Sequence, residues 1–163
     1  MTLPSKALTV HQRLLDFYGY PEWRNPLPPL DELVSTILSQ NTNDINRDKA
    51  FEALIARFPT WEEVRDAPLL EVQNAIRPAG LANQKGTRIQ QVLRAITAER
   101  GELSLEFLRD FTDQEAYDWL VKFKGVGPKT ATIVLQFSLG KPAFPVDTHV
   151  HRITGRIGLR PEK

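Results

Sequence analysis

Cysteine is absent from the 163-residue sequence. Disulfides, thiolate metal sites and cysteine-bound iron–sulfur clusters are therefore excluded for this chain. No apolar run approaches the roughly 18 residues that a membrane-spanning helix requires. The first residues, Thr2 to Lys6, lack the basic-then-apolar pattern of a signal peptide. We therefore expect a soluble, cytoplasmic protein.

Period-2 alternation of apolar and polar residues, the pattern of a half-buried strand, persists nowhere in the sequence. Residues 19–29, which contain four prolines, are expected to form a loop, and residues 81–86 a turn. Thr60 and Thr112 are each followed by glutamate three residues later, which predicts capping boxes at two short helices. Apolar residues at helical spacing predict an all-α protein whose main helices cover residues 8–18, 30–38, 44–58, 87–100, 128–139 and 146–159.

The charges are divided unevenly along the chain, although the net charge is only +1. The segment from Trp119 to Lys163 contains eight Lys and Arg residues and two acidic residues, whereas the preceding 118 residues contain thirteen and eighteen. Such an asymmetry suggests one face for a polyanion and another for solvent. The alternative is a chain that is simply acidic early and basic late.

The most informative stretch is residues 120–131, LVKFKGVGPKTA, in which an apolar helical run ends at a Gly-Val-Gly turn. Pro128 follows at the position where a second helix would begin, which suits its fixed φ and missing N–H. The predicted element is a pair of helices joined by a hairpin. Its Gly125 and Gly127 leave backbone N–H groups available to bind one phosphate oxygen. A plain helix–helix turn is the alternative interpretation.

Lys129 lies in the first turn of that second helix, and Asp147 follows eighteen residues later in Val-Asp-Thr-His. A lysine amine becomes nucleophilic when desolvation or neighbouring positive charge favours its neutral form, and Lys124 and the helix N-terminus supply such charge. Taken alone, Lys129 could be a surface lysine and Asp147 the N-cap of the last helix. A phosphate-binding turn, a lysine and one downstream carboxylate together suggest chemistry on nucleic acid.

Four motifs occur in the order typical of endonuclease III-like DNA glycosylases, the helix-hairpin-helix (HhH-GPD) superfamily of base-excision repair enzymes. They are residues 38–44 (LSQNTND), the turn from Gly80 to Lys85, residues 125–131 (GVGPKTA) and residues 146–149 (VDTH). The interval between the lysine and the aspartate also looks like that of the family, and the similarity spans roughly residues 30–159. A hairpin motif alone would be weak, but with four motifs in register the chain clearly resembles this superfamily.

The resemblance implies a helical barrel that carries the helix-hairpin-helix motif at residues 30–139, and a partial second helical subdomain formed by residues 1–29 and 140–163. DNA is implied to lie across the cleft between them. Many relatives end with four cysteines that hold a [4Fe–4S] cluster, which this chain cannot bind, so no cofactor is expected. The sequence stops sixteen residues after Asp147, so we expect a truncated or shortened member.

The implied activity is that of a bifunctional DNA glycosylase/AP lyase, which removes damaged bases, above all oxidised pyrimidines, through a Schiff base on Lys129. Asp147 is implied to assist attack at C1′ of the sugar, by accepting a proton or by stabilising the positively charged transition state. The implied partner is double-stranded DNA with damaged bases or abasic sites, bound by a monomeric, nucleoid-associated, prokaryotic protein.

Other activities remain open from the residues. One is a non-catalytic helix-hairpin-helix DNA-binding module, and another is a glycosylase for mismatched thymine or uracil, or for alkylated bases. Thr36 stands near the position where adenine-removing relatives without the lysine have a catalytic glutamate, which disfavours an adenine glycosylase.

The family motifs also assign DNA-binding residues. Asn41 and Leu81 match positions that enter the duplex and fill the hole left by a flipped nucleotide. The family often has glutamine at the position of Asn41, and here the glutamine is Gln40, so either residue is a candidate for insertion. No metal site is expected, because His149 and His151 lie on different helix faces without cysteine or an acidic cluster nearby. The other DNA-binding candidates are Lys85, Gly125, Val126, Gly127, Thr130 and His149.

Overall fold

We describe the protein from a computed structural model, which covers residues 2–22 and 25–160. Residues 1, 23–24 and 161–163, which the sequence placed in the chain-end subdomain, lie outside the described residues. Within the described ranges every regular element is a helix and there is no strand, which confirms the all-α prediction. None of the helices in these ranges is both long enough and apolar enough to cross a membrane.

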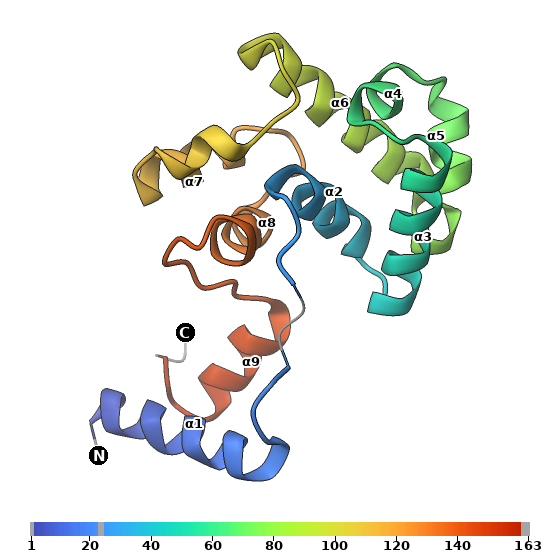
Figure 1. Cartoon of the computed structure of the whole chain (residues 1–163). Helices are drawn as coiled ribbons and strands as arrows, with labels where there is room; N and C mark the ends of the chain where they lie inside the picture. The colour runs from blue at the N-terminus through green and yellow to red at the C-terminus, as the bar shows by residue number, and fades with distance from the viewer. Residues whose placement is uncertain (1, 23–24, 161–163) are drawn as a thin grey trace. The chain divides into compact units, whose positions relative to one another are not determined.

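The chain divides into two compact units (Figure 1). The smaller unit, Met1–Asn25 with Val146–Lys163, contains α1 (Leu3–Tyr18) and α9 (Thr148–Arg156). The larger unit, Pro26–Pro145, contains α2 (Pro29–Ser39), α3 (Asp44–Arg57), α4 (Trp61–Asp66), α5 (Leu69–Ala75), η1 (Arg77–Ala79), α6 (Ala82–Arg100), η2 (Glu106–Arg109), α7 (Asp113–Val121), α8 (Pro128–Ile133) and η3 (Val134–Ser138).

Helix α2 is the centre of the larger unit. It packs against α3 and α6 on one side and against α8 and η3 on the other (Figure 1). Nine of its eleven residues are buried, including the polar Glu32, Ser35 and Thr36, so several faces of this helix are covered rather than one stripe. Its fully buried apolar side chains are Leu30, Leu33, Val34, Ile37 and Leu38, all at most 4% exposed.

The prediction of a turn at residues 81–86 is wrong, because α6 (Ala82–Arg100) already begins at Ala82. Gly86 is a helix-packing residue rather than a turn residue. A Cβ built there would lie 2.8 Å from Gln73 Cγ, so the missing side chain lets α5 approach α6 closely. Only Leu81 has the left-handed conformation expected of a turn.

The second helix of the hairpin differs from the expected span 128–139. Regular α-helix ends at Ile133 and continues as a π-helical segment, Val134–Ser138, in which Leu139 N donates to Val134 O at 3.2 Å. The last helix is likewise shorter than expected and ends at Arg156 rather than at residue 159.

Of the two predicted capping boxes, the one at Thr112 forms completely, whereas Thr60 forms only the N-cap bond. Thr112 and Glu115 make the complete capping box, and the hydrogen bonds from Thr112 hold the pKa of the Glu115 carboxyl below its usual range. At Thr60, the side chain accepts the backbone N–H of Glu63 at 3.2 Å. These local rules hold because a cap needs only residues that are three positions apart.

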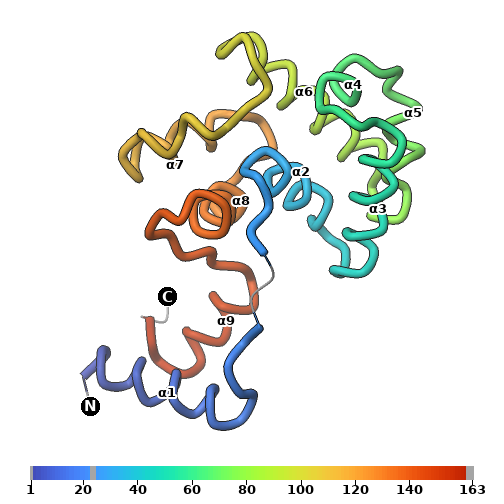
Figure 2. Tube along the Cα trace, viewed as in Figure 1, coloured from blue at the N-terminus to red at the C-terminus, as the bar shows by residue number. Residues whose placement is uncertain are grey.

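The smaller unit has little core of its own. Helices α1 and α9 lie side by side (Figure 2), and Lys6 Nζ donates to Gly158 O at 3.4 Å. Helix α1 has no buried residue, and most of its large apolar side chains are exposed: Leu3, Leu8, Leu14, Phe17 and Tyr18.

Candidate functional site: the hairpin and two loops of the larger unit

The hairpin between α7 and α8 is held by its apolar residues. Phe123 and Val126 are buried, and Val126 N donates to Phe123 O at 3.0 Å. Pro128 occupies the first turn of α8 as predicted. Since the first backbone N–H groups of a helix have no intrahelical acceptor, those of Gly127, Lys129 and Thr130 are directed out of the N-terminus of α8. This end of the helix also carries the positive pole of its dipole.

All three hairpin lysines, Lys122, Lys124 and Lys129, are exposed, and they differ in whether they form an ion pair. Lys122 is tied to Glu99 of α6 by an ion pair, and this hydrogen bond holds the pKa of the Glu99 carboxyl below its usual range. Lys124 and Lys129 are exposed. Among the described residues the Lys129 ammonium has no hydrogen bond or ion pair, so it is accessible to a ligand.

Gly125 is fixed by its neighbours as well as by its backbone. Its φ is +92°, and its carbonyl accepts Gln40 Nε2 at 3.4 Å. Gln40 Oε1 in turn accepts Arg88 Nη1 at 2.5 Å. A Cβ at Gly125 would lie 2.1 Å from Arg88 Nε and 2.2 Å from Arg88 Cδ. Arg88, which sequence reasoning missed, therefore joins α6 to the hairpin, and no motif in the sequence signals this contact.

Gly125→Ala is expected to lower the free energy of unfolding by about 2–3 kcal/mol, because it adds left-handed strain and displaces Arg88 from Gln40. Gly127→Ala is the matched control: its φ is −91°, and a Cβ there meets nothing within 4 Å. For this control we expect the free energy of unfolding to fall by less than about 1 kcal/mol. Urea unfolding of both variants measures the difference, and equal losses would show that the Arg88 contact does not constrain the turn.

Asp147 is the N-cap of α9, as the structural interpretation of the sequence predicted. Its Oδ1 accepts the backbone N–H of Val150 at 2.7 Å. Lys129 is positioned by the larger unit and Asp147 by the smaller one, so each side chain is held by its own helix N-terminus.

Asn41 and Leu81 share an uncommon backbone conformation. They are the two non-glycine residues with positive φ in residues 2–22 and 25–160, at +53° and +49°. Both are exposed; Leu81 is 49% exposed. Left-handed backbone costs an ordinary residue about 1–2 kcal/mol, and such strain concentrates at functional sites.

The turn at Asn41 explains its conformation. Thr42 N donates to Ser39 O at 3.3 Å, and Gln40 has φ −60° and ψ 124°. These angles, followed by a positive φ, describe a type II β-turn, in which the third position takes glycine or asparagine. The residue type does not explain the conformation of Leu81, because leucine, unlike asparagine, seldom adopts a positive φ.

The structure separates the two candidates for insertion. The Gln40 side chain is half-buried and bonded to Gly125 and Arg88, so it is not available in this conformation. Asn41 is exposed at the tip of the turn. Of the two alternatives, this conformation favours Asn41 over Gln40 as the candidate for insertion.

Three other predicted DNA contacts need correction. Lys85 is 2% exposed, and its ammonium donates to two backbone carbonyls instead of facing solvent. Val126 has a buried side chain, and its N–H is used by Phe123 O. The Thr130 side chain is buried, so only its backbone N–H could meet a phosphate. Sequence cannot give these orientations, because they depend on packing between helices.

The histidines of α9 are exposed and lie near arginines. His149 Nδ1 is 3.2 Å from Arg152 Nη2, and His151 Nδ1 is 3.2 Å from Arg160 Nη2. His149 thus lies one turn from Arg152, which adds positive charge to the same end of the smaller unit.

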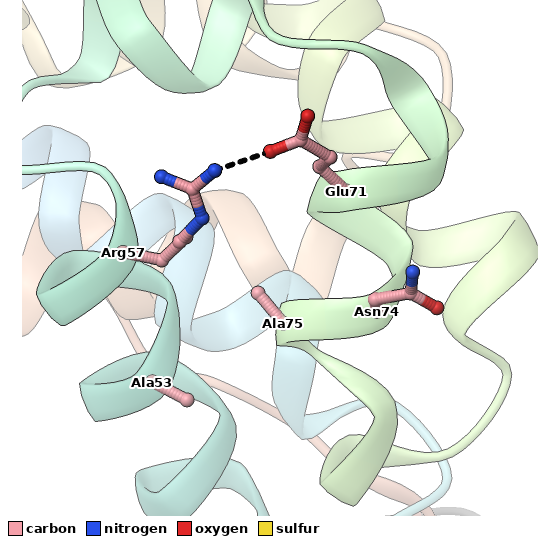
Figure 3. A pocket seen from close by; sticks show the side chains of 5 residues that line it. All are labelled: Ala53, Arg57, Glu71, Asn74 and Ala75. Carbon is pink, nitrogen blue, oxygen red and sulfur yellow. Dashed lines mark hydrogen bonds and ion pairs between the residues drawn. The ribbon is translucent and has the colours of Figure 1, made fainter.

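A pocket of about 380 Å³ lies apart from these residues. It is formed by α3 and α5, and the ion pair between Arg57 and Glu71, 2.5 Å long, crosses it (Figure 3). Its other lining residues are Ala53, Asn74 and Ala75, none of which belongs to the predicted site. We therefore assign it no part in the candidate site.

Known proteins match this chain over most of its length. Residues 34–163 match the family described as HhH-GPD superfamily base excision DNA repair protein. The Arabidopsis thaliana protein named "Putative DNA glycosylase At3g47830" is 46% identical over 133 residues, which are 82% of this chain and 45% of the plant protein. Endonuclease III of Thermotoga maritima is 36% identical over 139 residues, 85% of this chain and 61% of the enzyme. The chain thus spans about half of the length of these relatives.

A solved structure has the same fold. It is a trapped covalent intermediate of endonuclease III with DNA, and it is 29% identical with a TM-score of 0.76. The match covers 97% of this chain and 70% of that one. One feature of the wider group does not fit: with no cysteine, these 163 residues cannot ligate an iron–sulfur cluster through thiolates.

Proposed function

From the premise that the chain belongs to the HhH-GPD superfamily of base excision DNA repair proteins, we propose that it is a DNA glycosylase with AP lyase activity. The single observation that carries the proposal is Lys129, an exposed amine without a partner among the described residues, placed directly after the Gly-Val-Gly turn. The endonuclease III relative, trapped covalently on DNA, supports chemistry of this kind.

In the proposed reaction the neutral Lys129 Nζ attacks C1′ of the damaged nucleotide. The N-glycosidic bond breaks, and its electron pair leaves with the base, which is released after protonation. Loss of a proton from nitrogen and opening of the sugar ring give a Schiff base. The imine acidifies the C2′ hydrogen, and β-elimination then expels the 3′ phosphate. The carboxylate of Asp147 would accept a proton or stabilise the positive charge on the sugar.

The rest of the proposed site binds DNA. The N–H groups at the start of α8 would hold a backbone phosphate, which positions the strand without reading its sequence. Asn41 and Leu81 would enter the duplex and occupy the space left by the flipped nucleotide. Their exposure and positive φ support this role, since strained backbone concentrates at functional sites. We propose that one monomer binds one lesion.

Leu81→Gly is expected to separate DNA binding from stability. Its affinity for a duplex with an abasic site should fall about 10- to 100-fold, because burial of a leucine side chain contributes about 1.5–3 kcal/mol. Its stability should change by less than about 1 kcal/mol, because relief of left-handed strain offsets the entropy of glycine. Fluorescence anisotropy and urea unfolding measure the two quantities.

Leu81→Ala is the control for this pair of measurements, since it removes most of the side chain but retains the strained backbone. It should lose similar affinity and be less stable than Leu81→Gly. Abasic-site affinity unchanged in both variants would remove Leu81 from the proposed interface.

We propose oxidised pyrimidines as the substrate, on the basis of the resemblance to endonuclease III-like enzymes. A panel of duplexes tests this: one lesion each of an oxidised pyrimidine, 3-methyladenine, and thymine or uracil opposite guanine, followed by separate assays of base release and strand cleavage. Release of oxidised pyrimidine with cleavage supports the proposal. Release of another base would identify that base as the substrate instead. Duplex binding without release of any base would favour a non-catalytic binding module.

A further inference from the structure

The Lys85 side chain is the most unusual buried group of the larger unit. It is 2% exposed, and its Nζ donates to Leu38 O at 2.8 Å and to Ala79 O at 2.7 Å. Lysine is almost never fully buried unless its charge is compensated. Burial lowers the pKa of this amine, and even a neutral amine keeps two N–H donors, which equals the number of carbonyls bound here.

These two carbonyls lie at the helix ends that precede the two residues with positive φ. Leu38 lies three residues before Asn41, and Ala79 lies two residues before Leu81. The two oxygen atoms can be no farther apart than the combined length of the two hydrogen bonds, so one nitrogen atom joins the end of α2 to the end of η1. Helix α3, which follows Asn41, also packs against η1, which precedes Leu81.

We propose that Lys85 is a positioning residue that holds Asn41 and Leu81 in register with each other for entry into the DNA duplex. This inference rests on the proposed insertion of those two side chains. Each turn alone could shift along its helix axis, whereas a shared donor fixes both chain segments to one point. A small misplacement of a group that must fit a flipped-out site is costly in binding or rate.

The choice of lysine supports a positional role over a purely stabilising one. A methionine of similar length would fill the same space without the cost of removing an ammonium from water. Methionine cannot donate to the carbonyls of Leu38 and Ala79, which precede Asn41 and Leu81 in the chain. The two hydrogen bonds that Lys85 Nζ donates therefore distinguish lysine from methionine at this position.

Gln90 provides a matched control on the same helix. It is 3% exposed, and its Nε2 also donates to two backbone carbonyls, those of Val64 at 2.9 Å and Ala67 at 2.8 Å. These carbonyls belong to α4 and to the residue after it, and both are distant in sequence from Asn41 and Leu81. Gln90→Met thus removes a bond pair of the same kind, together with a longer bond of 3.4 Å from Arg94 Nη2 to Gln90 Oε1, at a place without a proposed DNA contact.

The test compares Lys85→Met with Gln90→Met on two duplexes. One contains tetrahydrofuran, an uncleavable abasic analogue, with 2-aminopurine opposite it, and the other is the intact duplex with 2-aminopurine paired. Anisotropy gives the preference for the abasic duplex, and 2-aminopurine fluorescence reports side-chain insertion beside it. We expect Lys85→Met to lose about ten-fold of the preference and most of the fluorescence change, while intact-duplex affinity is retained. In Gln90→Met, the preference for the abasic duplex and the fluorescence change should both stay within about two-fold of those of the unsubstituted protein.

Each outcome decides the proposal. Retained preference in Lys85→Met, or equal losses in the two variants, would overturn the positioning role, because the effect would then be absent or only general loosening. If the unsubstituted protein bound both duplexes equally, the proposed function itself would fail. Should Lys85→Met not fold, Lys85→Gln replaces it: its shorter side chain keeps N–H donors without the charge, and a smaller loss of about three-fold is expected. No loss in that folded variant would also contradict the proposal.

Discussion

Lys129→Ala is expected to eliminate the covalent adduct that borohydride traps on a duplex with one abasic site, by a factor of at least about 1,000. Borohydride reduces an imine to a stable amine, so the adduct forms only if a protein amine has condensed with the sugar. Lys129 is exposed in the first turn of α8, where alanine is an excellent helix former. Stability should therefore change by less than about 0.5 kcal/mol.

Lys124→Ala is the matched control, since Lys124 is also exposed and precedes Lys129 by five residues on the same hairpin. The yield of the trapped adduct should stay within a few-fold of that of the unsubstituted protein. Duplex binding should depend slightly less on salt, because one positive charge beside the proposed phosphate site is removed. Normal trapping by Lys129→Ala would assign the imine to another amine and refute the proposed nucleophile.

Asp147→Asn is expected to slow base release by about 100-fold or more, because asparagine can neither take up a proton nor stabilise positive charge on the sugar as a carboxylate does. The N-cap should survive, since the Asn side-chain oxygen can accept the Val150 N–H as Asp147 Oδ1 does. Single-turnover base release and urea unfolding separate the catalytic part from the structural part.

Asp147→Ala completes this comparison, because it removes the cap together with the carboxylate. It should lose about 1 kcal/mol of stability in addition to activity, whereas Asp147→Asn should lose activity alone. If Asp147→Asn released bases at the normal rate, Asp147 would be a helix cap without a catalytic role, as the structural interpretation of the sequence allows.

The features that sequence predicted best are local. The capping box at Thr112, the cap at Asp147 and Pro128 at the start of α8 each depend on residues within one helical turn. The spacing of apolar residues and the residue types at helix ends are therefore sufficient to locate these features. The motif order was equally informative about the family, since residues 34–163 match it.

The features that sequence missed depend on contacts between distant residues. The sequence predicted a turn at Gly86, but this glycine is needed where α5 packs against α6. The sequence also predicted that Lys85 contacts DNA, but the Lys85 ammonium donates to carbonyls of two other elements. Arg88 reads as a surface residue of a helix, yet its stem lies against Gly125. In each case the side chain is explained by a partner more than five residues away, which no local pattern encodes.

The conformation of Leu81 shows how structure adds to the motif. Resemblance marks Leu81 for insertion, and the structure adds that it is half exposed and left-handed, at a backbone position better suited to glycine. An exposed leucine under strain is poorly explained by stability. The combination therefore favours binding as the reason for this residue.

Mapping the borohydride adduct tests the central claim most directly. The protein is trapped on an abasic duplex, digested with protease and nuclease, and the modified lysine is located by tandem mass spectrometry. The account predicts the sugar remnant on Lys129, with unmodified Lys124 in the same sample. An adduct on any other amine, or full strand cleavage of the abasic duplex with no adduct at all, would contradict it.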